Sequence, residues 1–350
     1  MVRRLVFAVP GDLDTPTGGY AYDRRIISEL CGMGWAVEIL DLGAEFPRPS
    51  AAARADAHAR LTASDPAAAV VIDGLAWGVL PEVAEAMAKT HMTVALVHHP
   101  LALETGLPAQ EAQQFHDSER RALSCSRCAI ATSPATARIL VADYAVPQER
   151  VFVVRPGSDP VAPARGSADG VVSLLAVGAL VPRKGYDVLV EALGGLTDLA
   201  WRLTIVGDPS RDPQTARALS AMIADRGLGS RIALAGTVSA AELAGFYEAT
   251  DLFVLPSRFE GYGMAVADAI AYGLPVLAAR AGAIPETLPP DAGVMVPPDD
   301  VVVLRDTLRV LMTDRGRRER LRQVAHASAR RLPSWRSSAE IFARVIEELR

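Results

Sequence analysis

Short apolar runs of strand length alternate along the whole chain with segments whose apolar residues recur at helical spacing. Continuous apolar strands joined by helices indicate parallel sheets that are covered on both faces. In the first half we expect strands at Leu5–Pro10, Val37–Leu40, Ala68–Asp73, Thr93–His98, Ala129–Thr132 and Val151–Val154. The helices between them are expected at Tyr20–Met33, Leu80–Lys89, Ala109–Ser124 and Pro134–Asp143.

The same alternation restarts in the second half of the chain. The strands predicted there are Val172–Val177, Leu203–Val206, Ile232–Ala235, Leu252–Leu255 and Pro275–Ala279. The predicted helices are Gly185–Leu193, Pro213–Arg226, Ala240–Ala249, Met264–Tyr272, Val301–Thr313 and Arg317–Ala329. Two successive α/β patterns in 350 residues favour two domains, since each half is long enough to bury its own core.

The best candidate linker is the aperiodic stretch RPGSDPVAPARGSADG, from Arg155 to Gly170. We therefore expect one domain at 1–160 and another at 171–333. A last helix, Trp335–Leu349 within residues 334–350, would pack back on the first domain. The predicted fold is α/β, with two Rossmann-like doubly wound domains facing each other across a cleft. Such sheets bind ligands beyond the carboxyl ends of their strands.

Composition narrows the possible partners. Lys and Arg number 36 against 41 Asp and Glu, for a net charge of −5. This balance argues against nucleic acid as an obligate partner and against tight adhesion to anionic lipid. The apolar run after Arg3 and Arg4 is too short for a signal peptide, and no stretch is long enough to span a membrane. We therefore expect a cytoplasmic protein with no integral membrane segment.

The cysteines predict no metal or redox site. Cys125 and Cys128 have the CxxC spacing, but no second pair or suitably spaced histidine accompanies them. The pair also ends a predicted helix, whereas redox motifs usually begin one. We interpret both cysteines as small side chains buried against a sheet.

The strongest candidate ligand site is SRFEGYGMAVADAIAYGLPV, Ser257–Val276. The glycines on either side of Tyr262 let the backbone approach a ligand, and the N-terminus of the next helix, near Met264, suits a phosphate. Glu260 can accept hydrogen bonds from ligand hydroxyls, and Asp268 lies one turn deeper on the face of Met264. The same residues also fit a simple tight turn, with Glu260 as a helix cap and Asp268 in solvent.

The first half offers two further candidates. Gly18 and Gly19 lie between the first strand and its helix, and no GxGxxG fingerprint accompanies them, which weakens a nicotinamide dehydrogenase interpretation. His98 and His99 end a predicted strand, where side chains face a ligand crevice. Loops such as Phe46–Asp65 and Leu101–Gln110 follow no pattern that identifies what they bind.

The Ser257–Val276 stretch resembles the signature of retaining family-4 glycosyltransferases of GT-B fold, in which two glutamates separated by seven residues follow a strand. AVGALVPRKGYDVLVEAL, WRLTIVGD, LAGTVSAAELAGFYEATDLFVLPS and AGAIPETL fit the same family. The resemblance covers essentially the whole chain, strongly from about 171 to 300.

The resemblance implies roles for the second domain. Glu260 would bind the hydroxyls of the donor sugar, and Asp268 would accept from the ribose. Lys184 matches the family's phosphate-binding lysine, and the backbone at Val238 would contact the base. The sugar and its phosphate would be held by the backbone amides of Gly261, Tyr262, Gly263, Met264, Ala265 and Val266.

Two positions depart from the family pattern. Asp268 replaces a glutamate and is one methylene shorter, and Ala179 stands where the family often has an arginine. Arg183 either supplies the missing guanidinium or lies in solvent.

In the first domain the resemblance places His98 beside the donor sugar, and Gly18, Gly19 and His99 near the reaction centre on the acceptor side. Arg155–Asp159 would be an interdomain turn. Asp12 and Asp14 form a DxD, the metal signature of a different glycosyltransferase fold, so no metal is expected there.

The resemblance implies a retaining glycosyltransferase of hexosyltransferase type, with His98, Glu260 and Lys184 as catalytic residues. It would use a nucleotide diphosphate sugar, with a UDP-sugar slightly favoured over GDP-mannose, an unidentified acceptor, and neither a metal nor another cofactor. Two other hypotheses stay open: a nucleotide-sugar epimerase, and a catalytically weakened nucleotide-sugar-binding protein.

Overall fold

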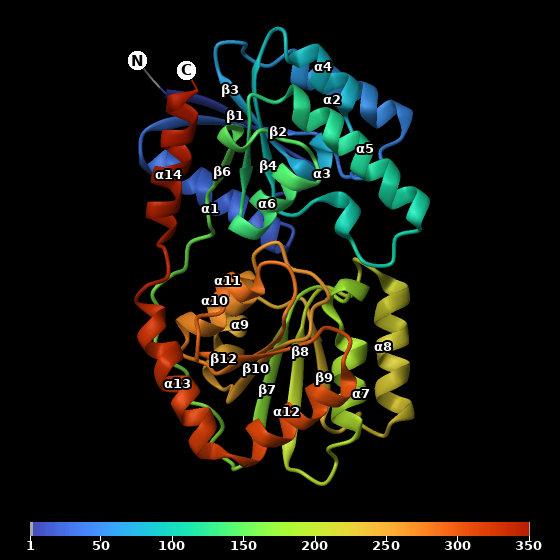
Figure 1. Ribbon diagram of the computed structural model, residues 1–350, viewed down its shortest axis with the longest axis vertical. Coiled ribbons are helices and arrows are strands. Elements are labelled where there is room, and N and C mark those ends of the chain that lie inside the picture. Colours follow the sequence, from blue (N-terminus) through green and yellow to red (C-terminus); the bar gives the residue numbers. More distant parts are fainter. Residues whose placement is uncertain (1–2, 350) are drawn as a thin grey trace. The chain divides into compact units, whose positions relative to one another are not determined.

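The computed structural model describes residues 3–349, which divide into two compact units (Figure 1). One unit combines the chain up to Gly157 with the segment from Pro333 onward, and the other is Ser158–Leu332. Among the described residues, no helix combines the length and the apolar character needed to span a membrane.

The first unit is built on a six-stranded parallel sheet with the order β2-β1-β3-β4-β5-β6. Its central strands are buried along their whole length because helices cover both faces. The order reverses between β1 and β3, which makes their carboxyl ends the topological switch point. The strands are β1 Arg3–Val9, β2 Trp35–Asp41, β3 Ala69–Asp73, β4 Met92–Val97, β5 Cys128–Ala131 and β6 Val151–Val153.

Most helices of this unit begin at a residue whose side chain caps the first turn. Thr17 caps α1, Ser50 caps α2 and Ser133 caps α6, each accepting a backbone N–H of the first turn. The helices are α1 Gly18–Gly32, α2 Ala51–Thr62, α3 Gly74–Trp77, α4 Pro81–Met87, α5 Ala109–Cys125, α6 Pro134–Ala142 and α14 Trp335–Glu348, with 3₁₀ turns η1 Leu101–Leu103 and η2 Gln148–Arg150.

Helix α14 completes the first unit although it comes last in the chain. It packs against α1, and the ring of Phe342 stacks on Phe7 of β1 with centroids 6.3 Å apart. Burying these two rings anchors the C-terminal segment to the N-terminal sheet.

The second unit has a six-stranded parallel sheet with the order β12-β11-β10-β7-β8-β9. Here β7 and β10 are neighbours, and the order reverses between them. The loops that follow these two strands therefore meet at the topological switch point, the usual ligand position in such sheets. The strands are β7 Val172–Val177, β8 Trp201–Val206, β9 Ile232–Gly236, β10 Leu252–Leu255, β11 Val276–Ala279 and β12 Gly293–Val296.

Helices cover both faces of the second sheet (Figure 1). Among them α9 begins with a reciprocal capping box between Ser239 and Glu242. The helices are α7 Tyr186–Gly194, α8 Pro213–Asp225, α9 Ala240–Glu248, α10 Met264–Ala271, α11 Ile284–Thr287, α12 Val301–Thr313 and α13 Arg315–Ala329, preceded by the 3₁₀ turn η3 Pro182–Lys184.

The structure corrects several expectations. Residues Phe46–Asp65 are not one loop, because Ala51–Thr62 forms α2 and buries Ala57 and Leu61. The strand Gly293–Val296 was missed because it is short and only its last residue is buried. Cys128 is buried as expected, whereas Cys125 is only partly buried.

Candidate functional site

The loops after β7 and β10 are joined directly at the switch point of the second unit. The backbone N–H of Arg258 donates to the carbonyl of Arg183 over 2.8 Å. A Cβ on Gly185, whose φ is +65°, would lie 2.3 Å from the carbonyl oxygen of Pro256. Only glycine permits this approach and this backbone conformation together. The contact fixes Arg183 and Lys184 beside the loop that carries Glu260.

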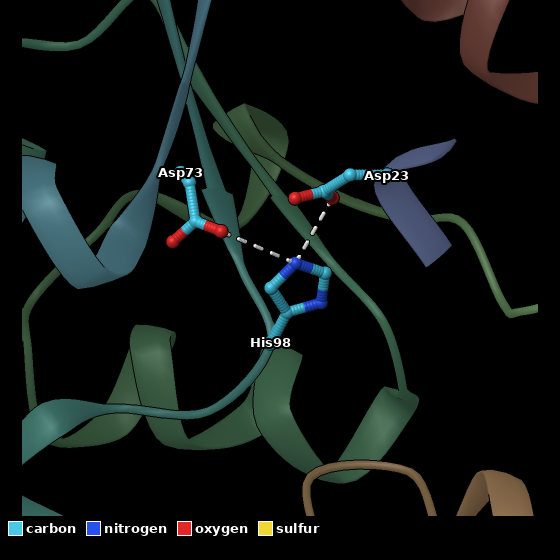
Figure 2. Close-up of side chains that lie close together, drawn as sticks. All are labelled: Asp23, Asp73 and His98. Atoms are coloured by element: carbon cyan, nitrogen blue, oxygen red, sulfur yellow. Dashed lines mark hydrogen bonds and ion pairs between the residues drawn. The ribbon is translucent and has the colours of Figure 1, made fainter. Parts of the chain in front are cut away.

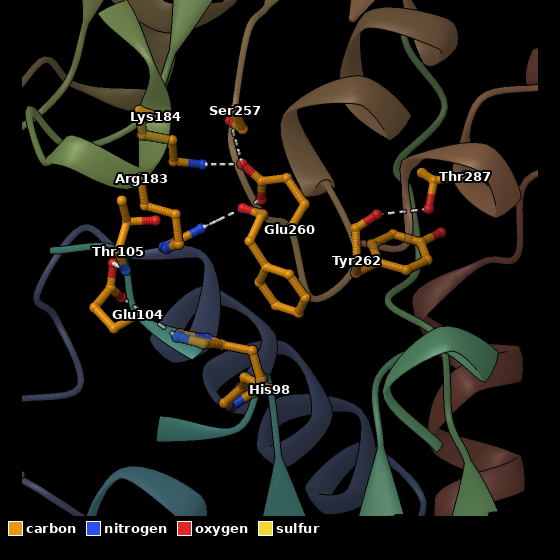
Figure 3. A network of polar contacts seen from close by, with 12 residues as sticks. His98, Glu104, Thr105, Arg183, Lys184, Ser257, Glu260, Tyr262 and Thr287 are labelled. Carbon is orange, nitrogen blue, oxygen red and sulfur yellow. Dashed lines mark hydrogen bonds and ion pairs between the residues drawn. The ribbon is translucent and has the colours of Figure 1, made fainter. Parts of the chain in front are cut away.

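Glu260 lies at the centre of a buried charge cluster in this unit (Figure 3). One carboxylate oxygen accepts from Lys184 Nζ over 2.6 Å and from Ser257 Oγ over 2.7 Å. The other lies 3.8 Å from an Arg183 guanidinium nitrogen. The Glu260 side chain is 8% exposed, and those of Lys184 and Arg183 are 13% and 16% exposed. Sequence reasoning missed Ser257, although it lies within the glycine-rich stretch.

The cations of this cluster fix the charge of Glu260. Burial would raise the pKa of Glu260, but the positive charges of Lys184 and Arg183 outweigh it, so the pKa is lowered. Glu260 is therefore a carboxylate at neutral pH, beside an ammonium and a guanidinium group. Positive groups of this kind suit an anionic ligand group.

The N-terminus of α10 lies in the same loop. Gly263, with a φ of +89°, is the N-cap residue, and as a glycine it has no side chain that could cap the first turn of α10. The backbone N–H of Val266 donates to the carbonyl of Gly263 over 2.9 Å, so this N–H is already used in the first turn of the helix. The Tyr262 carbonyl accepts from Thr287 Oγ1 over 2.5 Å, which orients the turn. The helix thus presents the positive end of its dipole beside the cluster.

Asp268 is half-buried in the middle of α10. No hydrogen bond to its carboxyl group is found in the described part of the chain. Burial, with a smaller effect of the negative charge of Asp159, raises the pKa of Asp268 to about 7. A half-buried carboxyl group without a protein donor suits a ligand hydroxyl.

Val238 and Ala179, the two other positions of this unit that the resemblance singles out, lie in the loops after β9 and β7. Val238 follows β9 and packs, partly buried, against the core that includes Phe253. Ala179 follows Gly178, whose carbonyl accepts from the hydroxyl of Tyr186 over 2.8 Å.

In the first unit the structure gathers polar side chains at the carboxyl ends of β3 and β4 (Figure 2). His98 follows β4, Asp73 ends β3, and Asp23 comes from α1. His98 Nε2 lies 3.1 Å from Asp23 Oδ1 and 3.7 Å from Asp73 Oδ2. Sequence reasoning identified His98 but missed both aspartates. The position of Asp73 at a strand end was a usable signal, whereas nothing in the sequence marked Asp23.

Gly18 and Gly19 open helix α1 beside this histidine. A Cβ on Gly19 would lie 3.2 Å from His98 Cδ2, so the glycine lets the helix start close to the imidazole ring. His99 is held separately, with Nε2 3.4 Å from Glu104 Oε2.

One group in the described residues has three suitable side chains close enough to surround a cation or share a proton. It consists of Asp23, Asp73 and His98, whose ligand atoms lie within 4.8 Å of one another. Asp12 and Asp14 form instead a local turn, in which the Asp14 amide donates to Asp12 Oδ1 over 2.8 Å.

Comparison with known proteins shows which family part of the chain matches. Residues 163–327 match the family described as "Glycosyl transferases group 1". The chain is 32% identical over 270 residues to D-inositol 3-phosphate glycosyltransferase of Xylanimonas cellulosilytica, covering 72% of this chain and 64% of that protein. It is 32% identical over 166 residues to mannosylfructose-phosphate synthase of Agrobacterium fabrum, covering 42% of this chain and 36% of that protein. The matches thus span less than two thirds of these relatives.

Solved structures share the fold across the chain. Sucrose-phosphate synthase from Thermosynechococcus elongatus aligns with a TM-score of 0.83 at 19% identity, over 99% of both chains. The Anabaena protein HepE, solved in complex with UDP-glucose, aligns with a TM-score of 0.82 at 16% identity, also over 99% of both chains. The chain therefore has the two-domain GT-B fold, and its residues 163–327 match the glycosyl transferases group 1 family.

Proposed function

We propose that the protein is a retaining glycosyltransferase that moves a hexose from a nucleotide diphosphate sugar to an acceptor without a metal ion. The observation that carries this proposal is the cluster of Lys184, Arg183 and Glu260, held at the switch point of the glycosyl transferases group 1 domain. A UDP-sugar is the favoured donor.

The cluster suits the departure of a nucleoside diphosphate. Negative charge grows on the phosphate oxygen as the bond to the sugar breaks, and preorganised cations stabilise that charge. The ammonium of Lys184 has three N–H donors, so it can hold Glu260 and also contact a phosphate oxygen. Glu260 would accept from sugar hydroxyls, and Asp268 from the ribose.

The reaction would be a front-face displacement. The bond from the anomeric carbon to the phosphate oxygen breaks while the acceptor oxygen forms its bond on the same face. The acceptor proton passes to the departing phosphate oxygen, so no protein nucleophile is needed. His98 would lie beside the sugar, with Gly18, Gly19 and His99 near the acceptor.

Thermal unfolding with UDP, GDP, ADP and their common sugars, in the presence of EDTA, tests the donor site. A ligand at 100 times its dissociation constant adds about 2.7 kcal/mol, which raises the melting temperature by several degrees. The nucleotide that shifts the curve identifies the base. Acceptor screening then begins with inositol phosphates and sugar phosphates, because the relatives are named for such compounds. A curve that no nucleotide shifts contradicts the proposal.

Binding of the donor should depend on pH through Asp268. With the pKa of Asp268 at about 7, only a minor fraction is ionised at pH 6 and most at pH 8. Because ribose hydroxyls donate best to the carboxylate, we expect affinity for a UDP-sugar to rise about tenfold over this range. Calorimetry of the wild type and Asp268→Asn at both pH values measures this, and the variant should show a flat profile. An equal pH dependence in both proteins would remove Asp268 from the ribose site.

A further inference from the structure

The first unit buries more negative charge around one imidazole than that imidazole can neutralise. Asp23 is 0% exposed and Asp73 is 4% exposed, and both face His98 Nε2. A ring nitrogen carries one hydrogen. At 3.1 Å it donates to Asp23, whereas 3.7 Å to Asp73 is too long for a hydrogen bond. Asp73 therefore needs another source of neutralisation.

The hydrogen bonds of the two aspartates show where that source lies. Asp73 Oδ1 accepts the backbone N–H of Leu75 over 2.7 Å. Asp23 Oδ2 is buried and has no hydrogen-bond partner among the described residues. In Figure 2 the second oxygen of Asp23 points toward the space between Asp73 and His98. Two carboxylates cannot bond to each other, but one added proton turns Asp73 into a donor for the unsatisfied oxygen of Asp23.

The charges in the cluster favour the added proton on Asp73. Burial, followed by the negative charge of Asp23, raises the pKa of Asp73 to about 7. Burial alone would lower the pKa of His98, but the charge of Asp23 and its hydrogen bond outweigh it, so that pKa is raised. Tyr22, which also packs against the imidazole, brings no charge: its ring meets the imidazole edge-on with ring centroids 5.3 Å apart, and its hydroxyl donates to the Val154 carbonyl.

We infer that Asp73 and Asp23 share one proton and that Asp23, through its remaining oxygen, holds His98 as an oriented imidazolium. Asp23 and Asp73 are thus positioning residues for His98. In this arrangement the protonated carboxyl group of Asp73 donates to Asp23 Oδ2, and His98 Nε2 donates to Asp23 Oδ1. The effect of this arrangement on catalysis rests on the proposed function, whereas the protonation of His98 does not depend on it.

The two aspartates give opposite expectations on amidation. In Asp73→Asn the side-chain amide can replace the shared proton, because its NH₂ donates to Asp23 while its oxygen still accepts from Leu75. In Asp23→Asn the charge that holds the imidazolium is lost. The exposed Asp56 of α2 supplies a control variant, Asp56→Asn.

Imidazole nitrogen NMR of the full chain across pH 5–9 tests the state of His98, with its signals assigned by His98→Gln. We expect wild type, Asp73→Asn and Asp56→Asn to keep His98 protonated above its ordinary range, and Asp23→Asn to shift its titration downward by at least one pH unit. An unchanged titration in Asp23→Asn overturns the inference. Nitrogen shifts that change on adding EDTA, or on adding Zn²⁺ after chelation, overturn it in favour of a bound cation.

Thermal unfolding adds a second readout. A raised pKa means that folded Asp73 retains a proton that the unfolded chain releases, so its contribution to stability falls as pH rises from about 4 to 7. Asp73→Asn should remove this contribution and flatten the profile relative to Asp56→Asn. An unaltered profile contradicts the shared proton.

Turnover separates this inference from the proposed function. If the protein transfers a sugar, Asp23→Asn should lower kcat at least tenfold with little change in donor affinity, Asp73→Asn should lower kcat less than Asp23→Asn does, and Asp56→Asn should match the wild type. A large loss of kcat in Asp73→Asn would overturn the positioning role, since its amide reproduces the protonated carboxyl. If no transfer is found, the NMR result still decides the state of His98.

Discussion

Replacement of Lys184 by alanine should lower turnover about 100- to 1,000-fold, the usual effect of removing one preorganised charge from a reaction centre. The Lys184 ammonium lies 2.6 Å from Glu260 and is mostly buried, so its charge acts where water screens it least. Its loss also leaves Glu260 with the neutral hydroxyl of Ser257 and the more distant Arg183, which should raise the pKa of that carboxyl and destabilise the second unit.

Initial rates with a UDP-sugar, together with thermal unfolding, measure both effects. Lys89 is the only other lysine in the chain, and Lys89→Ala is therefore the matched control. Lys184→Gln keeps a neutral donor for Glu260 and separates loss of charge from loss of fold. Turnover that stays at the wild-type level in a folded Lys184→Ala protein would remove this residue from the mechanism.

Gly207→Ala should destabilise the second unit by about 3 kcal/mol or more, because the added methyl group meets backbone rather than a movable side chain. A Cβ at Gly207 would lie 1.8 Å from the carbonyl oxygen of Gly178. Gly178 in turn lies under Lys184, since a Cβ there would be 2.6 Å from Lys184 Cε. Relief of the clash must therefore move the loop that positions the lysine.

Thermal unfolding should show a melting temperature lower by roughly 6–12 °C, given 2–4 °C for each kcal/mol in a domain of this size. Nucleotide binding should weaken in parallel. Gly245→Ala in helix α9 is the control, because a Cβ there meets nothing within 4 Å and alanine favours the helix by about 0.5–1 kcal/mol. If both variants melt alike, the contact between the β7 and β8 loops does not constrain this unit.

The architecture could be predicted from the sequence because strands and helices are marked by patterns among neighbouring residues. Strands such as Leu252–Leu255 are apolar throughout, and helix starts such as Ser239 carry their own caps. The errors fell where these signals are weak. Helix α2 is rich in alanine, so its apolar face is weakly marked, and β12 is only half-buried over most of its length at a sheet edge.

By itself, the sequence determined that two α/β domains follow one another and that a glycine-rich loop with Glu260 begins a helix. These conclusions need only periodicity and neighbouring residues. The tertiary structure decided which distant groups meet: Lys184 with Glu260 across neighbouring strands, and Asp23 with Asp73 and His98 from three separate elements. Such contacts depend on strand order and on the burial of each charge. No short stretch of sequence encodes the strand order or the burial of a charge, because these arise only when the sheet is assembled and water is excluded.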